Sequence, residues 1–81
     1  MRLPRDLRGV ELAMLLSRYG YGVTRQTGSH MRLTTAQRGE HHVTVPSQST
    51  LRVGTLSAIL TDVAAHLQIS RQELMQELFG K

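Results

Sequence analysis

The chain has 81 residues, which is enough for one domain, because typical domains run to about 100–150 residues. A hydrophobic content of 40% supports a folded core, and the absence of cysteine excludes disulfides and thiolate metal sites. Nine of the ten basic residues are arginine, the acidic residues number six, and the net charge is +4. This balance is typical of a polyanion binder, because the planar arginine side chain pairs with phosphate through two hydrogen bonds.

The chain carries no sign of a membrane or export segment. No apolar run approaches the ~18 residues of a membrane span, and the first residues lack the apolar stretch of a signal peptide. We therefore predict one cytoplasmic domain over residues 1–81.

The first segment is predicted to be a helix. Its apolar residues recur every three or four positions, on one face: Leu12, Leu15, Leu16 and Tyr19. Asp6 is the expected N-cap, and Gly20 is the expected stop.

Three segments of alternating apolar and polar residues follow and predict three half-buried strands. Residues 26–28 and 37–39 each place glycine third, as a three-residue hairpin loop requires. A two-residue loop is rejected, because it would set apolar residues against polar ones on every rung. The predicted partners across the sheet are Val23 with Met31, Arg25 with Ser29, Ala36 with Glu40, Met31 with Val45, and Leu33 with Val43.

Two further helices complete the pattern. Thr55 is the expected N-cap of the first, whose apolar stripe is Leu56, Ile59, Leu60, Val63 and Leu67. The second opens with a capping box between Ser70 and Glu73. The predicted class is α+β, in the order α-β-β-β-α with a short C-terminal helix. Its three-stranded antiparallel sheet carries helices on one face, which is the layout of the double-stranded-RNA-binding domain.

The other face of this sheet is expected to be open to solvent. The residues assigned to it are Thr24, Gln26, His30, Arg32, Thr34, His42 and Thr44. His30 is expected to lie opposite Pro46 at one end of the sheet, and His42 at the other end, roughly 13 Å away along the strand. His41 is expected to point to the other face of the sheet. His66 has no second ligand three or four residues further on. We therefore predict no metal site and no cofactor.

The segment of residues 25–32 is the strongest candidate for chemistry. It places one imidazole, His30, on the open face beside a tight glycine turn, with arginines nearby. Histidine can transfer a proton to or from an RNA oxygen near neutral pH, and arginine can balance the charge of the phosphate. Ser29 is not expected to form a dyad with His30, because adjacent strand residues face opposite ways.

Four blocks of this sequence, in order, resemble the HicA toxins of toxin–antitoxin systems. They are residues 3–7 and 11–12 at the start of the first helix, residues 25–30 with the Gly-Ser-His run, residues 43–46 in the third strand, and residues 54–60 at the second helix. The resemblance implies a small double-stranded-RNA-binding-like domain that cleaves mRNA. It implies His30 as the catalytic residue and a HicB-like antitoxin as protein partner.

On this reading Arg25, Ser29 and Arg32 are candidate RNA contacts, and Gly28 shapes the turn that presents His30. An alternative is a non-catalytic double-stranded-RNA-binding module of the same fold. Such modules usually carry lysines at the start of their last helix, and residues 54–57 have none. A DNA-binding antitoxin is a third possibility, but no helix-turn-helix is evident.

Overall fold

The computed structural model describes residues 3–80, so Met1, Arg2 and Lys81, the ends of the predicted domain, lie outside the described residues. The element order confirms the predicted α+β class. The elements are helix α1 (Gly9–Leu16), 3-10 helix η1 (Ser17–Tyr19), strands β1 (Gly22–Thr27), β2 (His30–Thr35) and β3 (His41–Pro46), and helices α2 (Val53–Leu67) and α3 (Arg71–Phe79).

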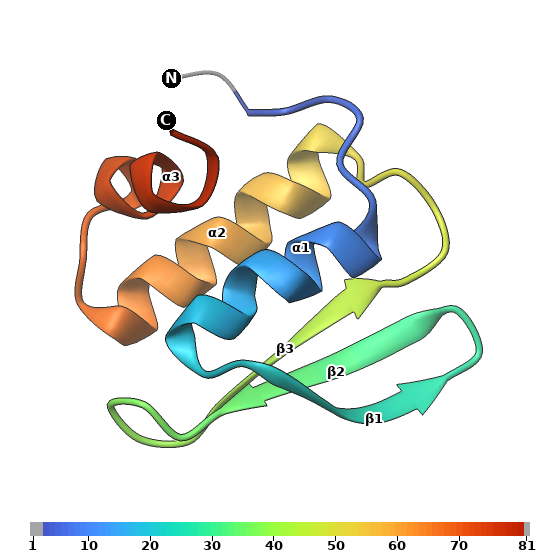
Figure 1. Ribbon diagram of the computed structural model, residues 1–81, viewed down its shortest axis with the longest axis horizontal. Helices are drawn as coiled ribbons and strands as arrows, with labels where there is room; N and C mark the ends of the chain where they lie inside the picture. The colour runs from blue at the N-terminus through green and yellow to red at the C-terminus, as the bar shows by residue number, and fades with distance from the viewer. Residues whose placement is uncertain (1–2, 81) are drawn as a thin grey trace.

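The molecule has a helical layer on one face of an antiparallel sheet with strand order β1-β2-β3 (Figure 1). Helices α1 and α2 cover this face, and α3 packs beside α2. The core lies between the two layers, and every residue of the predicted α2 stripe is buried. Within residues 3–80, no helix lies over the opposite face of the sheet (Figure 1).

The start of α1 differs from the prediction. The helix begins at Gly9 with Arg8 as N-cap, so the prediction of Asp6 as N-cap was wrong. Glu11 explains the shift, because its Oε1 accepts a hydrogen bond from the Arg8 backbone N–H at 2.8 Å. Gly20 closes the segment at a left-handed φ of 84°, as expected.

Of the two predicted N-caps of the later helices, one differs from the structure and one agrees with it. Helix α2 begins at Val53, two residues before the predicted N-cap Thr55, and no side chain caps it. Helix α3 follows Ser70, whose Oγ accepts a hydrogen bond from the Glu73 N–H at 2.9 Å, which confirms the predicted cap.

Strands β2 and β3 pair in the predicted register. Met31 lies opposite Val45, Leu33 opposite Val43, and His30 opposite Pro46. The four apolar side chains in these pairs are all buried, so the alternation of the two strands determines their register.

Strands β1 and β2 pair differently from the prediction. The turn is a two-residue loop, Gly28 and Ser29, and a β-bulge interrupts the ladder between Val23 and Arg25. Val23 therefore lies opposite Leu33, and the prediction of Met31 as its partner was wrong. Because the bulge adds a residue to β1, it offsets the change of face that the shorter loop would impose.

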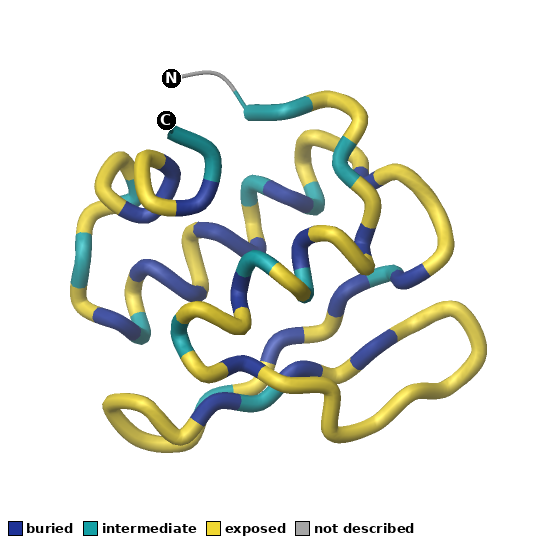
Figure 2. Tube along the Cα trace, viewed as in Figure 1, coloured by how far each residue is buried: buried dark blue, intermediate teal, exposed yellow. Residues whose placement is uncertain are grey.

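The bulge exchanges two neighbouring residues of β1 between the faces of the sheet. Arg25 pairs with Arg32 on the open face, so the predicted partner Ser29 was wrong. Gln26 pairs with buried Met31, so its predicted position on the open face was also wrong. Every residue of β1 is exposed, in contrast to the predicted half-buried strand (Figure 2).

The close approach of α1 to the end of β3 depends on one glycine. A Cβ atom at Gly9 would overlap the carbonyl oxygen of Pro46 and lie 3.1 Å from the Cα of Ser47. Both are backbone atoms, which cannot move aside without shifting the strand. Gly54 in α2 has nothing within 4 Å of the same position.

Gly9→Ala is expected to lower the free energy of unfolding by about 1–3 kcal/mol, because the added methyl group overpacks the helix–strand contact. Gly54→Ala is the matched control and should raise it by roughly 0.5–1 kcal/mol, since alanine is the better helix former. Urea denaturation measures both. A Gly9→Ala variant as stable as wild type would contradict this packing.

Candidate functional site

Two arginines lie side by side in the middle of the open face. The register places Arg25 of β1 opposite Arg32 of β2, and Thr44 of β3 lies on the other side of Arg32. Directly opposed residues of an antiparallel pair have Cα atoms about 4.5–5.5 Å apart, and their side chains share one face. Within residues 3–80, neither arginine side chain forms an ion pair or hydrogen bond.

His30 lies in the next row of the same face. It is the first residue of β2, paired with Thr27 on one side and Pro46 on the other, and it is exposed. His30 and Arg32 are two positions apart along the strand, which corresponds to about 6.6 Å at ~3.3 Å per residue. The structure thus places His30, Arg25 and Arg32 on one surface, whereas the predicted alternation of the first strand puts Arg25 on the opposite face of the sheet.

Ser29 contacts His30, against the expectation that the two side chains diverge. The Ser29 Oγ and the His30 Nδ1 are 3.3 Å apart. Ser29 lies in the two-residue turn and not in the strand, so the alternation of strand side chains does not apply to it. The contact involves Nδ1, and within the described part of the chain no hydrogen bond reaches Nε2 of His30.

The turn that carries His30 is constrained from both sides. Gly28, at the first loop position, has a φ of 53°, a conformation that glycine adopts without steric cost. The Ser29 carbonyl accepts a hydrogen bond from the Ser47 N–H at 2.7 Å, just beyond the end of β3. The backbone angle of Gly28 and the hydrogen bond of Ser29 therefore fix the turn from which His30 begins β2.

The other end of the open face carries a hydrogen-bonded row. Thr34 Oγ1 lies 2.7 Å from Thr24 Oγ1 and 2.7 Å from the Nδ1 of His42. The Nε2 of His42 is 3.4 Å from a carboxylate oxygen of Glu40. Both ring nitrogens of His42 therefore have protein partners, whereas His30 has one only at Nδ1 among the described residues.

A second histidine cluster lies between the sheet and α2. His41 bonds Tyr21 through Nδ1, at 2.7 Å from the phenol oxygen, and Asp62 through Nε2, at 3.1 Å. His66 stacks on the His41 ring with centroids 4.3 Å apart, and its Nε2 bonds the backbone carbonyls of Gln37 and Gly39. This cluster joins the loop between β2 and β3 to α2. Sequence reasoning missed it, because only the tertiary fold brings His41 and His66 together.

Across residues 3–80, no cluster of three or more histidine, aspartate or glutamate side chains is arranged to hold a metal ion. In the same range, no helix is both long and apolar enough to cross a membrane.

The comparison with protein families decides the assignment. The model of the HicA toxin family, from bacterial toxin–antitoxin systems, matches residues 9–64, which is more than half of the chain. The chain belongs to the HicA toxin family. The matched range includes the turn with His30 and all three strands. No curated protein and no solved structure matches the chain. Family membership gives the protein a toxin role and an antitoxin partner.

The histidine cluster also yields a prediction for the behaviour of Tyr21 at high pH. Burial, and secondarily the negative charge of Asp62, raise the pKa of Tyr21 to about 12. The folded protein therefore retains this proton to higher pH than the unfolded chain, whose tyrosines have a pKa near 10. The resulting stability is present below pH ~10 and is lost as the pH rises towards 12.

We expect the free energy of unfolding to fall between pH 10 and 12, and Tyr21→Phe to weaken that fall. The variant should also lose about 1 kcal/mol at neutral pH, because it lacks the hydrogen bond to His41. Urea denaturation at a series of pH values provides the measurement, and Tyr19→Phe is the control that keeps Tyr21. Equal pH profiles for wild type and Tyr21→Phe would contradict the prediction.

Proposed function

We propose that this toxin is a metal-independent RNA endonuclease that cleaves mRNA in the cytoplasm and thereby arrests growth. The observation that carries the proposal is the pairing of Arg25 with Arg32 on the open face, one row from His30. Family membership supports the toxin role, and the site supports the chemistry.

The two arginines favour a phosphate ligand. Like charges directly opposite each other across a sheet are unfavourable, and an anion between them removes the repulsion. A guanidinium group can donate two parallel hydrogen bonds to one phosphate, so the pair can bind a single phosphodiester from two sides. Two guanidinium groups at one phosphate would stabilise the negative charge that develops in the transition state of RNA cleavage.

His30 is the proton-transfer group of this mechanism. The contact of Nδ1 with Ser29 orients the ring, and Nε2 is then the nitrogen for the RNA. It takes the proton from the 2′-hydroxyl that attacks phosphorus or delivers one to the departing 5′-oxygen, and water serves the other oxygen. Arg25 and Arg32 stabilise the charge on the non-bridging oxygens meanwhile.

His42 is not the second acid or base at the same phosphate. Its partner on β2 is Thr34, four residues from His30, which corresponds to roughly 13 Å along the strand. A pair of groups acting on one phosphodiester must both lie within hydrogen-bond reach of it.

His30→Ala is expected to abolish RNA cleavage while the protein remains folded, because the side chain is exposed and fills no core volume. His42→Ala is the matched control on the same face and should retain cleavage. The assay is the cleavage of an mRNA transcript by purified protein in excess EDTA, with circular dichroism as the test of folding.

A folded His30→Ala variant that cleaves as fast as wild type would contradict the assignment. Cleavage by wild type that stops in EDTA and returns with Mg²⁺ would contradict the metal-independent mechanism. RNA binding without cleavage by wild type would favour the non-catalytic double-stranded-RNA-binding module.

Salt dependence tests the arginine pair. Each phosphate contact contributes about −0.7 to −0.9 to the slope of log K against log salt. Arg25→Gln and Arg32→Gln should therefore each make the slope shallower by nearly one unit, measured in the His30→Ala background so that the RNA stays intact. Arg38→Gln is the control, because Arg38 lies in the loop between β2 and β3 and its guanidinium donates a hydrogen bond to Gln68 at the end of α2. An unchanged slope in both test variants would place RNA binding elsewhere.

A further inference from the structure

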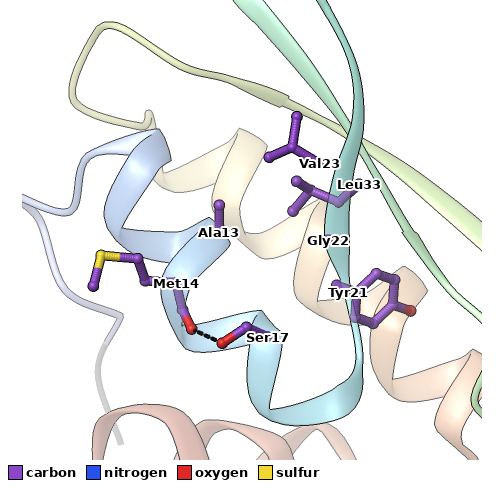
Figure 3. Close-up of a pocket in the computed structure, with 7 residues that line it drawn as sticks. All are labelled: Ala13, Met14, Ser17, Tyr21, Gly22, Val23 and Leu33. Atoms are coloured by element: carbon purple, nitrogen blue, oxygen red, sulfur yellow. Dashed lines mark hydrogen bonds between the residues drawn. The ribbon is translucent and has the colours of Figure 1, made fainter.

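An apolar groove lies between α1 and β1 (Figure 3). Its volume is about 340 Å³, and it is lined by Ala13, Met14, Ser17, Tyr21, Gly22, Val23 and Leu33. Two of these apolar side chains are unusually exposed for their type, Met14 at 75% and Val23 at 51%. Val10, one turn before Met14, is 41% exposed and extends the apolar surface along α1. The groove can accept one or two large apolar side chains.

Beside the groove, β1 forms a free edge of the sheet. It is the outermost strand, paired with β2 alone, and all six of its residues are exposed. Since β1 uses one side of its backbone to pair with β2, the alternate N–H and C=O groups on its outer side have no strand to pair with. An exposed edge of this kind is a template for the addition of another strand.

The charge on this edge is positive. Strand β1 contains Arg25 and no acidic residue. The acidic side chains with contacts in the structure include Glu11 with the Arg8 backbone, Glu40 with His42, Asp62 with His41, and Glu77 with Arg18, and none of them belongs to β1.

We propose that the β1 edge and its groove bind an extended segment of the antitoxin in which apolar and acidic residues alternate. Such a segment pairs with β1 as a fourth strand. Its apolar side chains then lie on the helical side of the sheet, over Val23 and the groove. Its acidic side chains lie on the open face, beside Arg25. The alternation of the segment follows from the period of two in a strand.

A second copy of this chain does not fit the same edge. Two β1 strands side by side would bring two Arg25 side chains together with no carboxylate from either strand. A charged side chain on an edge strand disfavours pairing of that edge with a second copy of itself. An acidic partner turns the same arginine into a favourable contact.

Binding of this segment would also affect the proposed RNA site, and this step rests on the proposed function. Arg25 belongs both to the edge strand and to the arginine pair on the open face. A carboxylate beside Arg25 occupies the place of an RNA phosphate, so binding of the segment and binding of RNA compete.

The test is an NMR titration of isotopically labelled protein with an acetylated heptapeptide that alternates glutamate and valine. We expect chemical-shift changes at the backbone amides of Gly22–Thr27 and at the methyl groups of Met14 and Val23. A heptapeptide with lysine in place of glutamate is the peptide control and should bind at least tenfold more weakly.

Variants of the protein provide the second arm. Met14→Asp should weaken binding of the glutamate peptide at least tenfold, because it places a charge in the apolar surface and repels the acidic segment. Val53→Asp is the matched control, since Val53 is also exposed, at 48%, but does not line the groove. Neither residue belongs to the RNA site, so cleavage should be unchanged in both variants.

Several results would overturn the proposal: no binding of the glutamate peptide, equal binding of both peptides, or shift changes away from β1 and α1. Dimerisation of the wild type that Met14→Asp abolishes would assign the groove to a second copy. Peptide binding requires no nuclease activity, so failure of cleavage would leave this inference standing. Peptide binding that leaves the affinity of the His30→Ala variant for RNA unchanged would overturn the competition.

Discussion

The register between β1 and β2 is the constraint on which the open face of this protein depends. The two-residue turn at Gly28 and Ser29 would by itself reverse the faces of the whole strand, and the bulge before Arg25 restores them for the residues that precede it, including Val23. The result is a strand whose first part follows the apolar side of the sheet while Arg25 reaches the polar side. Without the bulge, Val23 would face solvent on the side of the sheet that carries no helix.

The two ends of the sheet have different roles in this arrangement. At one end, His41 and His42 are both engaged, the first with Tyr21 and Asp62 and the second with Thr34. At the other end, the His30 side chain is exposed and forms one hydrogen bond among residues 3–80, to Ser29 of the turn. His41 and His42 have protein partners at both ring nitrogens, and His66 is stacked on His41 and bonded through Nε2. His30 differs from all three in being exposed and unstacked, with no hydrogen bond to Nε2 in the described part of the chain.

The proposed RNA site and the proposed partner site share one side chain, Arg25. Phosphates and carboxylates both satisfy a guanidinium group through paired hydrogen bonds, so one positive edge can serve both ligands. The apolar groove distinguishes the two ligands. A polypeptide strand can bury apolar side chains over Val23, whereas an RNA backbone has no apolar group to bury there. A toxin that must be active alone and silent in complex can use this difference, since the partner gains apolar burial that the RNA does not offer.

Periodic features of the sequence determined the elements, the pairing of β2 with β3, and the position of His30 and Arg32 on the open face, because these follow from local periods of 3.6 and 2. The cap at Ser70 was equally readable, since all its atoms come from one turn. The place of Arg25, the contact of Ser29 with His30, and the partners of Tyr21 were decided by the tertiary structure. A bulge changes the side-chain alternation without leaving a mark in the pattern, and contacts between distant segments depend on how α1 and α2 pack over the sheet.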